Sequence, residues 1–377
     1  MRKVTLKLSD GTSFEGRSFG YEAPASGEVV FNSAMMGYPE TLTDPAYAGQ
    51  ILVLTYPLIG NYGVPDVTAK MPNGLSTYLE SDRIHVRALV VSDYSETFSN
   101  WNAKESLGEW LQREKIPAIT GVDTRELTKT IREKGSMTGK LIFDAEVNNV
   151  EEQNAAIAFV SEVSCKEVIE YKAAEYVPLV LDGGEPSPTP VLGKKVVVVD
   201  CGLCNNNLRS LLSRGVDVVR VPWDYDFNTL TFDGLFISSG PGNPELCAKT
   251  IEHLRKYLEN TAQKPLMAIG LGQQLLALAL GAKVNKLRYG HHSHNQPVRQ
   301  IDATRCFITT QNHGYAVDAA TLPADWKATY VNMNDDSNEG FRHESAPWFG
   351  LQFLPEACGG TPDAELPLYE EFINNMK

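Results

Sequence analysis

The chain has 377 residues, of which 42% are hydrophobic and 21% charged, and its formal net charge is −13. This length exceeds one ordinary hydrophobic core, so the sequence predicts two domains. An acidic surface repels phosphate backbones, which argues against nucleic acid as a partner. No apolar run approaches the ~18 residues of a membrane span, and the N-terminus lacks the apolar core of a signal peptide. We therefore expect a cytoplasmic protein with no membrane partner.

Residues 1–150 predict an N-terminal domain of mixed α/β class. A β-hairpin is expected around Asp10-Gly11, and buried strands are expected within 49–60 and 85–93. An amphipathic pattern over 103–115 predicts a helix. A second helix is predicted to end at Gly135 and to begin with Asp123 or Thr124 as its N-cap.

Residues 151–193 predict a linker region. Two helical stretches come first, and LDGGEPSPTPVLG (181–193) follows them. Its prolines and glycines predict a connection that is semi-rigid in its middle.

Residues 194–377 predict a C-terminal domain with a doubly wound parallel sheet. The run VVVVD (196–200) is typical of a strand buried on both faces. Helical and strand patterns then alternate as far as the helix that follows PLMAIG (265–270), which is the mark of an α/β sheet. Antiparallel strands are expected over 296–351.

Chemistry in such a sheet collects at the carboxyl ends of the strands. Three of these ends carry candidate features. The segment SSGPGNP (238–244) can present backbone N–H groups to a carboxylate or an oxyanion. The segment PLMAIGLGQQLLALALGA (265–282) predicts a strand–turn–helix elbow with Gly270 at its apex, and QFLPE (352–356) ends on Glu356. That carboxylate is either an orienting acid or a solvated loop residue.

Three other readings are disfavoured. The elbow lacks the third small residue of a dinucleotide loop, because position 275 is Leu. Cys201 and Cys204 have C-x-x-C spacing but no second pair, which favours reduced thiols. His291, His292 and His294 lie close together with no acid beside them in the sequence, so we expect a structural loop and no metal.

The ordered set of motifs matches a family. The whole chain resembles the small subunit of carbamoyl phosphate synthetase, nearly end to end. Its C-terminal half resembles a class I glutamine amidotransferase domain. In the N-terminal half the resemblance rests on 27–64 and on GVDTRELTKTIREKG (121–135). In the C-terminal half it rests on SSGPGNP, the elbow, 278–298, TTQNHGYAV (309–317) and LPEA.

The resemblance implies a catalytic triad that this chain does not carry. The nucleophilic Cys of the family's G-I-C-L-G elbow is Gly270 here, and the basic His of its G-H-P-E turn is Leu354. Only the orienting acid, Glu356, matches. Gln273 stands where His is usual, and Ala46 replaces a glutamine-contacting Ser. His313 matches the family's Q-N-H-G and is not expected to be a relocated base. The remaining glutamine-binding positions match: Gly240, Gly242, Leu271, Gln274, Asn312, Gly314 and Tyr315.

The favoured hypothesis is a small subunit whose own glutaminase is inactive. It would support or regulate an ammonia-using large subunit that makes carbamoyl phosphate from bicarbonate for arginine and pyrimidine synthesis. ATP and magnesium are expected on that partner, with no cofactor in this chain and at most weak binding of glutamine or glutamate. One alternative is a glutaminase with a non-standard nucleophile, Cys204 or Cys358. The other is a stand-alone binding or sensor module.

Overall fold

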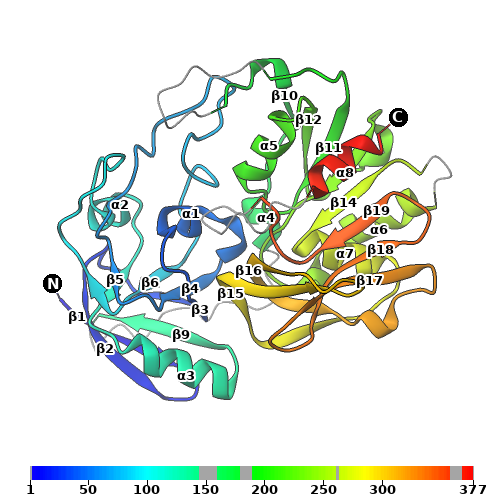
Figure 1. Ribbon diagram of the computed structural model, residues 1–377. Coiled ribbons are helices and arrows are strands. Elements are labelled where there is room, and N and C mark those ends of the chain that lie inside the picture. Colours follow the sequence, from blue (N-terminus) through cyan, green and yellow to red (C-terminus); the bar gives the residue numbers. More distant parts are fainter. Residues whose placement is uncertain (1, 144–158, 179–188, 260–262, 357–366, 377) are drawn as a thin grey trace.

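The computed structural model describes residues 2–143, 159–178, 189–259, 263–356 and 367–376. Each half of the described chain is built on one large β-structure (Figure 1). No helix within those ranges is long and apolar enough to cross a membrane.

The N-terminal half is built on a closed seven-stranded barrel, in the order β1-β2-β8-β6-β4-β3-β9. β1 and β2 form the hairpin predicted around Asp10-Gly11, with Lys3 opposite Arg17. β3, β4, β6 and β8 run parallel to one another, and β9 closes the barrel against β1 and β3. The strands are β1 (Lys3–Leu8), β2 (Ser13–Ser18), β3 (Ala25–Asn32), β4 (Gln50–Leu54), β6 (Ala88–Val90), β8 (Ala118–Thr120) and β9 (Met137–Ile142).

Short helices and a two-stranded sheet surround the barrel. Ser106 caps α2, and its side chain and that of Glu109 form a reciprocal capping box. Asp123 caps α3 by accepting a hydrogen bond from the N–H of Glu126, and Gly135 ends that helix at φ 98°. Both predicted ends of this helix are therefore confirmed, with Asp123 as the cap. These elements are α1 (Tyr38–Thr43), η1 (Pro45–Tyr47), β5 (Leu58–Ile59), β7 (Asp93–Tyr94), α2 (Leu107–Arg113) and α3 (Thr124–Lys134).

The C-terminal half is a ten-stranded sheet, in the order β10-β12-β11-β13-β14-β19-β18-β17-β15-β16. The run from β12 to β19 is parallel, and β18, β17, β15 and β16 extend it with antiparallel strands. The strands are β10 (Ile169–Tyr171), β11 (Lys195–Asp200), β12 (Asp217–Pro222), β13 (Gly234–Ile237), β14 (Leu266–Ile269), β15 (Val284–Gln300), β16 (Cys306–Val317), β17 (Trp326–Asn332), β18 (Asn338–His343) and β19 (Trp348–Leu351).

Helices cover both faces of the parallel strands. On β11, Val196 and Val198 belong to the core beneath α5 and α8, whereas Val197 and Val199 belong to the core beneath α6 and α7. This alternation is what a strand buried on both faces produces, and it confirms the doubly wound prediction. The helices are α4 (Phe159–Val163), α5 (Asn205–Leu212), α6 (Ala248–Leu258), α7 (Leu271–Ala279), α8 (Leu368–Asn374), η2 (Ala173–Glu175), η3 (Phe227–Thr229), η4 (Pro244–Leu246) and η5 (Ala319–Thr321).

The antiparallel strands expected over 296–351 are present, with two differences from the expected pattern. The antiparallel region begins at β15, earlier than residue 296, and β19 pairs in parallel with β14 before it pairs with β18. Residues 169–171 form a strand against β12 that the linker pattern did not predict. Much of the predicted linker, including 179–188, lies outside the described residues.

The two halves meet where β15 and β16 approach the barrel (Figure 1). Polar side chains join them across this contact, so residues from both halves can share one site. The bonds are Lys286 Nζ to Glu28 Oε1 at 2.8 Å, Ser33 Oγ to Ser293 Oγ at 2.9 Å and Asn312 Nδ2 to Asp44 Oδ2 at 2.8 Å.

Candidate functional site

The elbow predicted at Gly270 is present. β14 ends at Ile269 and α7 begins at Leu271, with Gly270 between them at φ 56° and ψ −115°. A residue with a side chain rarely adopts this conformation, and holding one there costs about 1–3 kcal/mol. The N–H of Gly270 donates to Leu351 O at 2.7 Å, which fixes the turn against the end of β19. The apex thus has the geometry of a nucleophile elbow but presents no side chain.

A backbone cradle surrounds the apex. The loop after β13 brings Gly240 so close to the chain that an added Cβ would lie 2.0 Å from Cys201 O. Gly242 lies nearby at φ 87°. Leu271 is the first residue of α7, so its N–H has no acceptor within the helix and can serve a ligand. The cradle predicted from SSGPGNP and the elbow is therefore assembled from two neighbouring strand ends.

Leu354 is the residue that the family resemblance matches to the base position. It follows β19, and its N–H donates to Thr310 O at 2.9 Å. Its side chain is 8% exposed and belongs to the hydrophobic core. A hydrocarbon at this position can neither accept a proton nor donate one.

Glu356 lies in a cavity between the two halves. Leu354, Asp44, Asn312 and Cys204 line the same cavity. Both carboxylate oxygens of Glu356 are buried, and neither has a hydrogen-bond partner among the described residues. Burial, with smaller effects from Glu80 and Asp44, raises the pKa of Glu356 to about 8. The alternative of a solvated loop acid was therefore wrong.

Three further acids line this cavity, and the sequence analysis did not find them. Burial raises the pKa of Glu40 to about 7 and also raises the pKa of Asp44. Glu80 is paired with Arg209, whose Nη1 lies 3.5 Å from Glu80 Oε1. Glu40 and Asp44 lie on α1 and at its C-cap, whereas Glu80 and Glu356 come from distant segments, so only the fold shows that all four carboxyls meet.

The positions matched to glutamine contacts lie around the elbow and the interface. Ala46 belongs to η1, and its N–H donates to Asp44 Oδ1 at 2.9 Å. Gln274 Nε2 donates to Tyr315 O and to Gln352 Oε1, both at 3.1 Å, which ties α7 to β16 beside Gly314. Because Asn312 Nδ2 donates to Asp44, its amide already has a protein partner.

Comparison with known proteins assigns both halves. Residues 6–141 match the family model "Carbamoyl-phosphate synthase small chain, CPSase domain", and residues 197–375 match "Glutamine amidotransferase class-I". The arginine-specific small chain of carbamoyl phosphate synthase from Neosartorya fischeri is 45% identical over 381 residues, which cover 100% of this chain and 80% of that protein. The chain belongs to the carbamoyl phosphate synthase small-chain family. The family and the fold class predicted from the sequence are both confirmed.

Other relatives of this small chain are much longer proteins. Carbamoyl-phosphate synthase [ammonia], mitochondrial, from Homo sapiens is 47% identical over 372 residues, which cover 99% of this chain and 24% of that protein. Multifunctional protein pyr1-3 from Dictyostelium discoideum is 46% identical over 384 residues, which cover 100% of this chain and 17% of that protein. The chain thus spans a quarter or less of these two relatives.

The cysteines considered as substitute nucleophiles in this small chain are Cys204 and Cys358, and Gln273 stands where His is usual. Cys204 is buried at the start of α5, and its Sγ lies 3.5 Å from Asp44 Oδ1. Gln273 is also buried, and its Nε2 donates to Asn338 Oδ1 at 3.1 Å. Neither Cys201 nor Cys204 forms a disulfide bond with another described residue. Cys358 lies outside the described residues.

Proposed function

We propose that this chain acts as a small chain of carbamoyl phosphate synthase whose own glutamine hydrolysis has been lost. It serves as a structural or regulatory partner of a large ATP-using component that takes ammonia as its nitrogen donor. That component, with its ATP and magnesium, is either a separate chain or another part of a longer protein. The observation that carries the proposal is that the elbow presents Gly270 and the base position holds Leu354.

Glutamine hydrolysis by this family's chemistry needs a thiolate and a proton shuttle. Gly270 supplies no sulfur, and Leu354 supplies no imidazole. Glu356 also differs from an orienting carboxylate, because a pKa of about 8 leaves it mainly protonated at pH 7. In a serine protease, removal of the nucleophile or the base costs about 10⁶ in rate. A loss of that size removes glutamine as a useful nitrogen source.

One relative supports ammonia as the nitrogen donor. The human protein that is 47% identical to this chain carries the description "[ammonia]" in its name. The backbone cradle around Gly240, Gly242 and Leu271 remains, so glutamine or glutamate binds weakly without being hydrolysed. The pathways served are arginine and pyrimidine synthesis, for which carbamoyl phosphate is the shared intermediate.

Cys204 is the alternative nucleophile that shares the cavity with Glu356. Its position argues against reactivity, because its Sγ lies 3.5 Å from an oxygen of Asp44. Carboxylates nearby disfavour the thiolate, which is the reactive form. We therefore assign Cys204 a structural role.

The test is a synthesis assay with the chain co-purified with its large component. Carbamoyl phosphate is measured with ammonium, with glutamine and with no nitrogen donor, and glutamate release is measured in parallel. We expect synthesis from ammonium and none from glutamine above the donor-free control. Glutamine-dependent synthesis would refute the loss, and its disappearance in Cys204→Ala would identify the substitute nucleophile. Failure to co-purify with any large component would instead favour a stand-alone binding module.

A further inference from the structure

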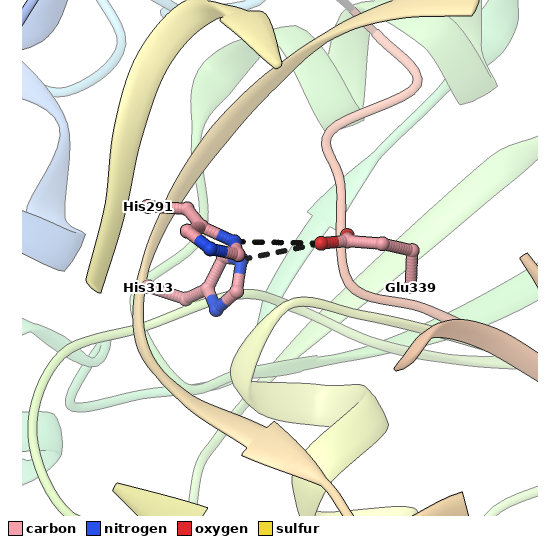
Figure 2. Close-up of side chains that lie close together, drawn as sticks. All are labelled: His291, His313 and Glu339. Atoms are coloured by element: carbon pink, nitrogen blue, oxygen red, sulfur yellow. Dashed lines mark ion pairs between the residues drawn. The ribbon is translucent and has the colours of Figure 1, made fainter. Parts of the chain in front are cut away.

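A second polar cluster lies within the antiparallel part of the sheet. It consists of His291 on β15, His313 on β16 and Glu339 on β18, whose side chains converge in Figure 2. His291 Nδ1 lies 3.5 Å from Glu339 Oε1, and His313 Nε2 lies 4.0 Å from the same oxygen. The three side chains are 5%, 3% and 0% exposed. Neither this geometry nor the acid in it was visible from the sequence run around His291.

The outer nitrogen of each ring faces a group that can only accept a hydrogen bond. His291 Nε2 lies 2.9 Å from Asp335 Oδ2, and His313 Nδ1 lies 2.8 Å from Tyr315 O. Each of these nitrogens must therefore carry the hydrogen. In a neutral imidazole the other nitrogen then has a lone pair. The lone pairs of both rings thus point inward, toward each other and toward Glu339.

Gln311 adds a further acceptor to the centre. Its Oε1 lies 3.0 Å from His291 Nδ1 and 3.0 Å from His313 Nε2. Gln311 Nε2 donates to Thr309 Oγ1 at 3.1 Å, and the single hydroxyl hydrogen of Thr309 is used on Gln296 O at 2.9 Å. The oxygen of Gln311 is therefore held against two nitrogen lone pairs.

Few donors offset this concentration of acceptors. Asn332 Nδ2 lies 3.1 Å from Glu339 Oε1 and 3.3 Å from His291 Nδ1. Within the described ranges, Glu339 Oε2 is buried and has no hydrogen-bond partner. A buried carboxylate oxygen without a partner is costly. A positive charge at the centre of the cluster would offset these acceptors.

We propose that His291 Nδ1, His313 Nε2 and the Glu339 carboxylate bind one divalent transition metal ion, with Gln311 Oε1 as the fourth ligand. Two imidazoles and a carboxylate form a ligand set that suits Zn²⁺. A tetrahedral ion with bonds of about 2.0–2.1 Å separates its ligand atoms by about 3.3 Å. The separations of 3.0, 3.5 and 4.0 Å here bracket that value.

The second shell agrees with a metal site. Metal-bound histidines usually donate their remaining N–H to a carboxylate or a backbone carbonyl, which sets the ring and its tautomer. Asp335 and Tyr315 O provide these two acceptors. A route of entry exists, because His291 also lines the cleft that Gln296 and Asn334 border.

The ion would have a structural role. It would join β15, β16 and β18 at one point, and β18 is hydrogen-bonded both to α7 and to the segment that follows β19. Gln352 N donates to Glu339 O at 2.9 Å, and Asn338, next to Glu339, accepts from Gln273 of α7. All four protein ligands close the coordination sphere, so no position remains for a substrate.

Protons are the alternative source of positive charge. Burial opposes protonation of His291, but its hydrogen bonds to Asp335 and Glu339 outweigh this and raise its pKa to about 9. A protonated His291 donates a hydrogen from Nδ1 to Gln311 Oε1, but the lone pair of His313 Nε2 still faces that oxygen. The two arrangements differ in whether the chain retains a metal ion, which can be measured directly.

The test uses the full chain with its thiols alkylated, stripped with a chelator and dialysed against Zn²⁺ or Co²⁺. We expect one ion per chain by elemental analysis, and intense visible d–d absorption from four-coordinate Co²⁺ without thiolate charge transfer. Glu339→Gln preserves the shape of the side chain and should weaken binding at least ~10-fold. His343→Gln, on the same strand but outside the cluster, should leave binding unchanged.

Folding of each variant is checked by circular dichroism. If Glu339→Gln does not fold, Asp335→Asn is the second variant, and we expect it to weaken Zn²⁺ binding roughly 10-fold through the second shell. Retention of less than about one-tenth of an ion per chain by the wild type, or equal affinity in wild type and Glu339→Gln, would overturn the proposal. Either outcome leaves the proposed loss of glutamine hydrolysis untouched, because that rests on Gly270 and Leu354.

Discussion

Replacing Gly270 with alanine tests whether the elbow still has the strained conformation of a nucleophile turn. At φ 56° and ψ −115°, any side chain costs about 1–3 kcal/mol. The new Cβ would also lie 3.0 Å from the Cβ of Ser239, so that neighbour must move by a few tenths of an ångström. We expect the free energy of unfolding to fall by about 2–3 kcal/mol, measured by urea denaturation.

Two matched glycines separate the causes. Gly281 has φ 82° and open space around its Cβ position, so Gly281→Ala reports the backbone cost alone. Gly314 has open space and no positive φ, so Gly314→Ala should change stability little or increase it slightly. The order of loss should be Gly270, then Gly281, then Gly314. A Gly270→Ala protein as stable as the Gly314→Ala protein would refute the reasoning.

Three other predictions concern the site and the core. In a coupled glutamate assay, Gly270→Cys alone should release glutamate from glutamine at no more than the wild-type background rate. The double variant Gly270→Cys with Leu354→His should release it at least ~10-fold faster than that background. Because the pKa of Glu356 is higher in the folded chain than its ordinary value of 4.5, proton binding by this carboxyl stabilises the fold. This contribution to the free energy of unfolding is complete below pH 4.5 and is lost as the pH rises to about 8. Glu356→Gln should therefore gain stability relative to wild type by about 1.4 kcal/mol per pH unit within that window, in paired urea titrations. Arg220→Met should cost about 3–5 kcal/mol, because the buried carboxylate of Asp200 loses a partner 2.6 Å away, whereas Lys3→Met at an exposed pair should change stability by less than ~1 kcal/mol.

Local signals in the sequence predicted the elements well. The helix at 124–134 begins and ends where Asp123 and Gly135 indicate, because caps act within a few residues. The continuous valines of 196–199 predicted a strand buried on both faces, and helices cover both. The elbow at Gly270 followed from an apolar run, a small residue and a helical pattern in immediate succession.

Contacts between distant segments could not be predicted in the same way. Glu40, Asp44, Glu80 and Glu356 line one cavity only because the barrel and the sheet meet there. His291 and Glu339 lie 48 positions apart in the chain, on strands that do not pair directly, and the folded sheet brings them to 3.5 Å. The adjacent histidines drew attention to the wrong pattern, since the cluster uses one of them together with residues from two other strands.

The losses at the triad reinforce one another. Leu354 offers no imidazole that could take the proton of Glu356, and this buried carboxyl, with a pKa of about 8, remains mainly protonated at pH 7. A protonated acid cannot stabilise an imidazolium, so a histidine restored at 354 would also have to lower that pKa before it could work as a base. A cysteine restored at 270 would meet the strain of the elbow without a base to activate it. We therefore expect recovery of glutamine hydrolysis to need simultaneous changes at 270 and 354, and either change alone to gain no activity.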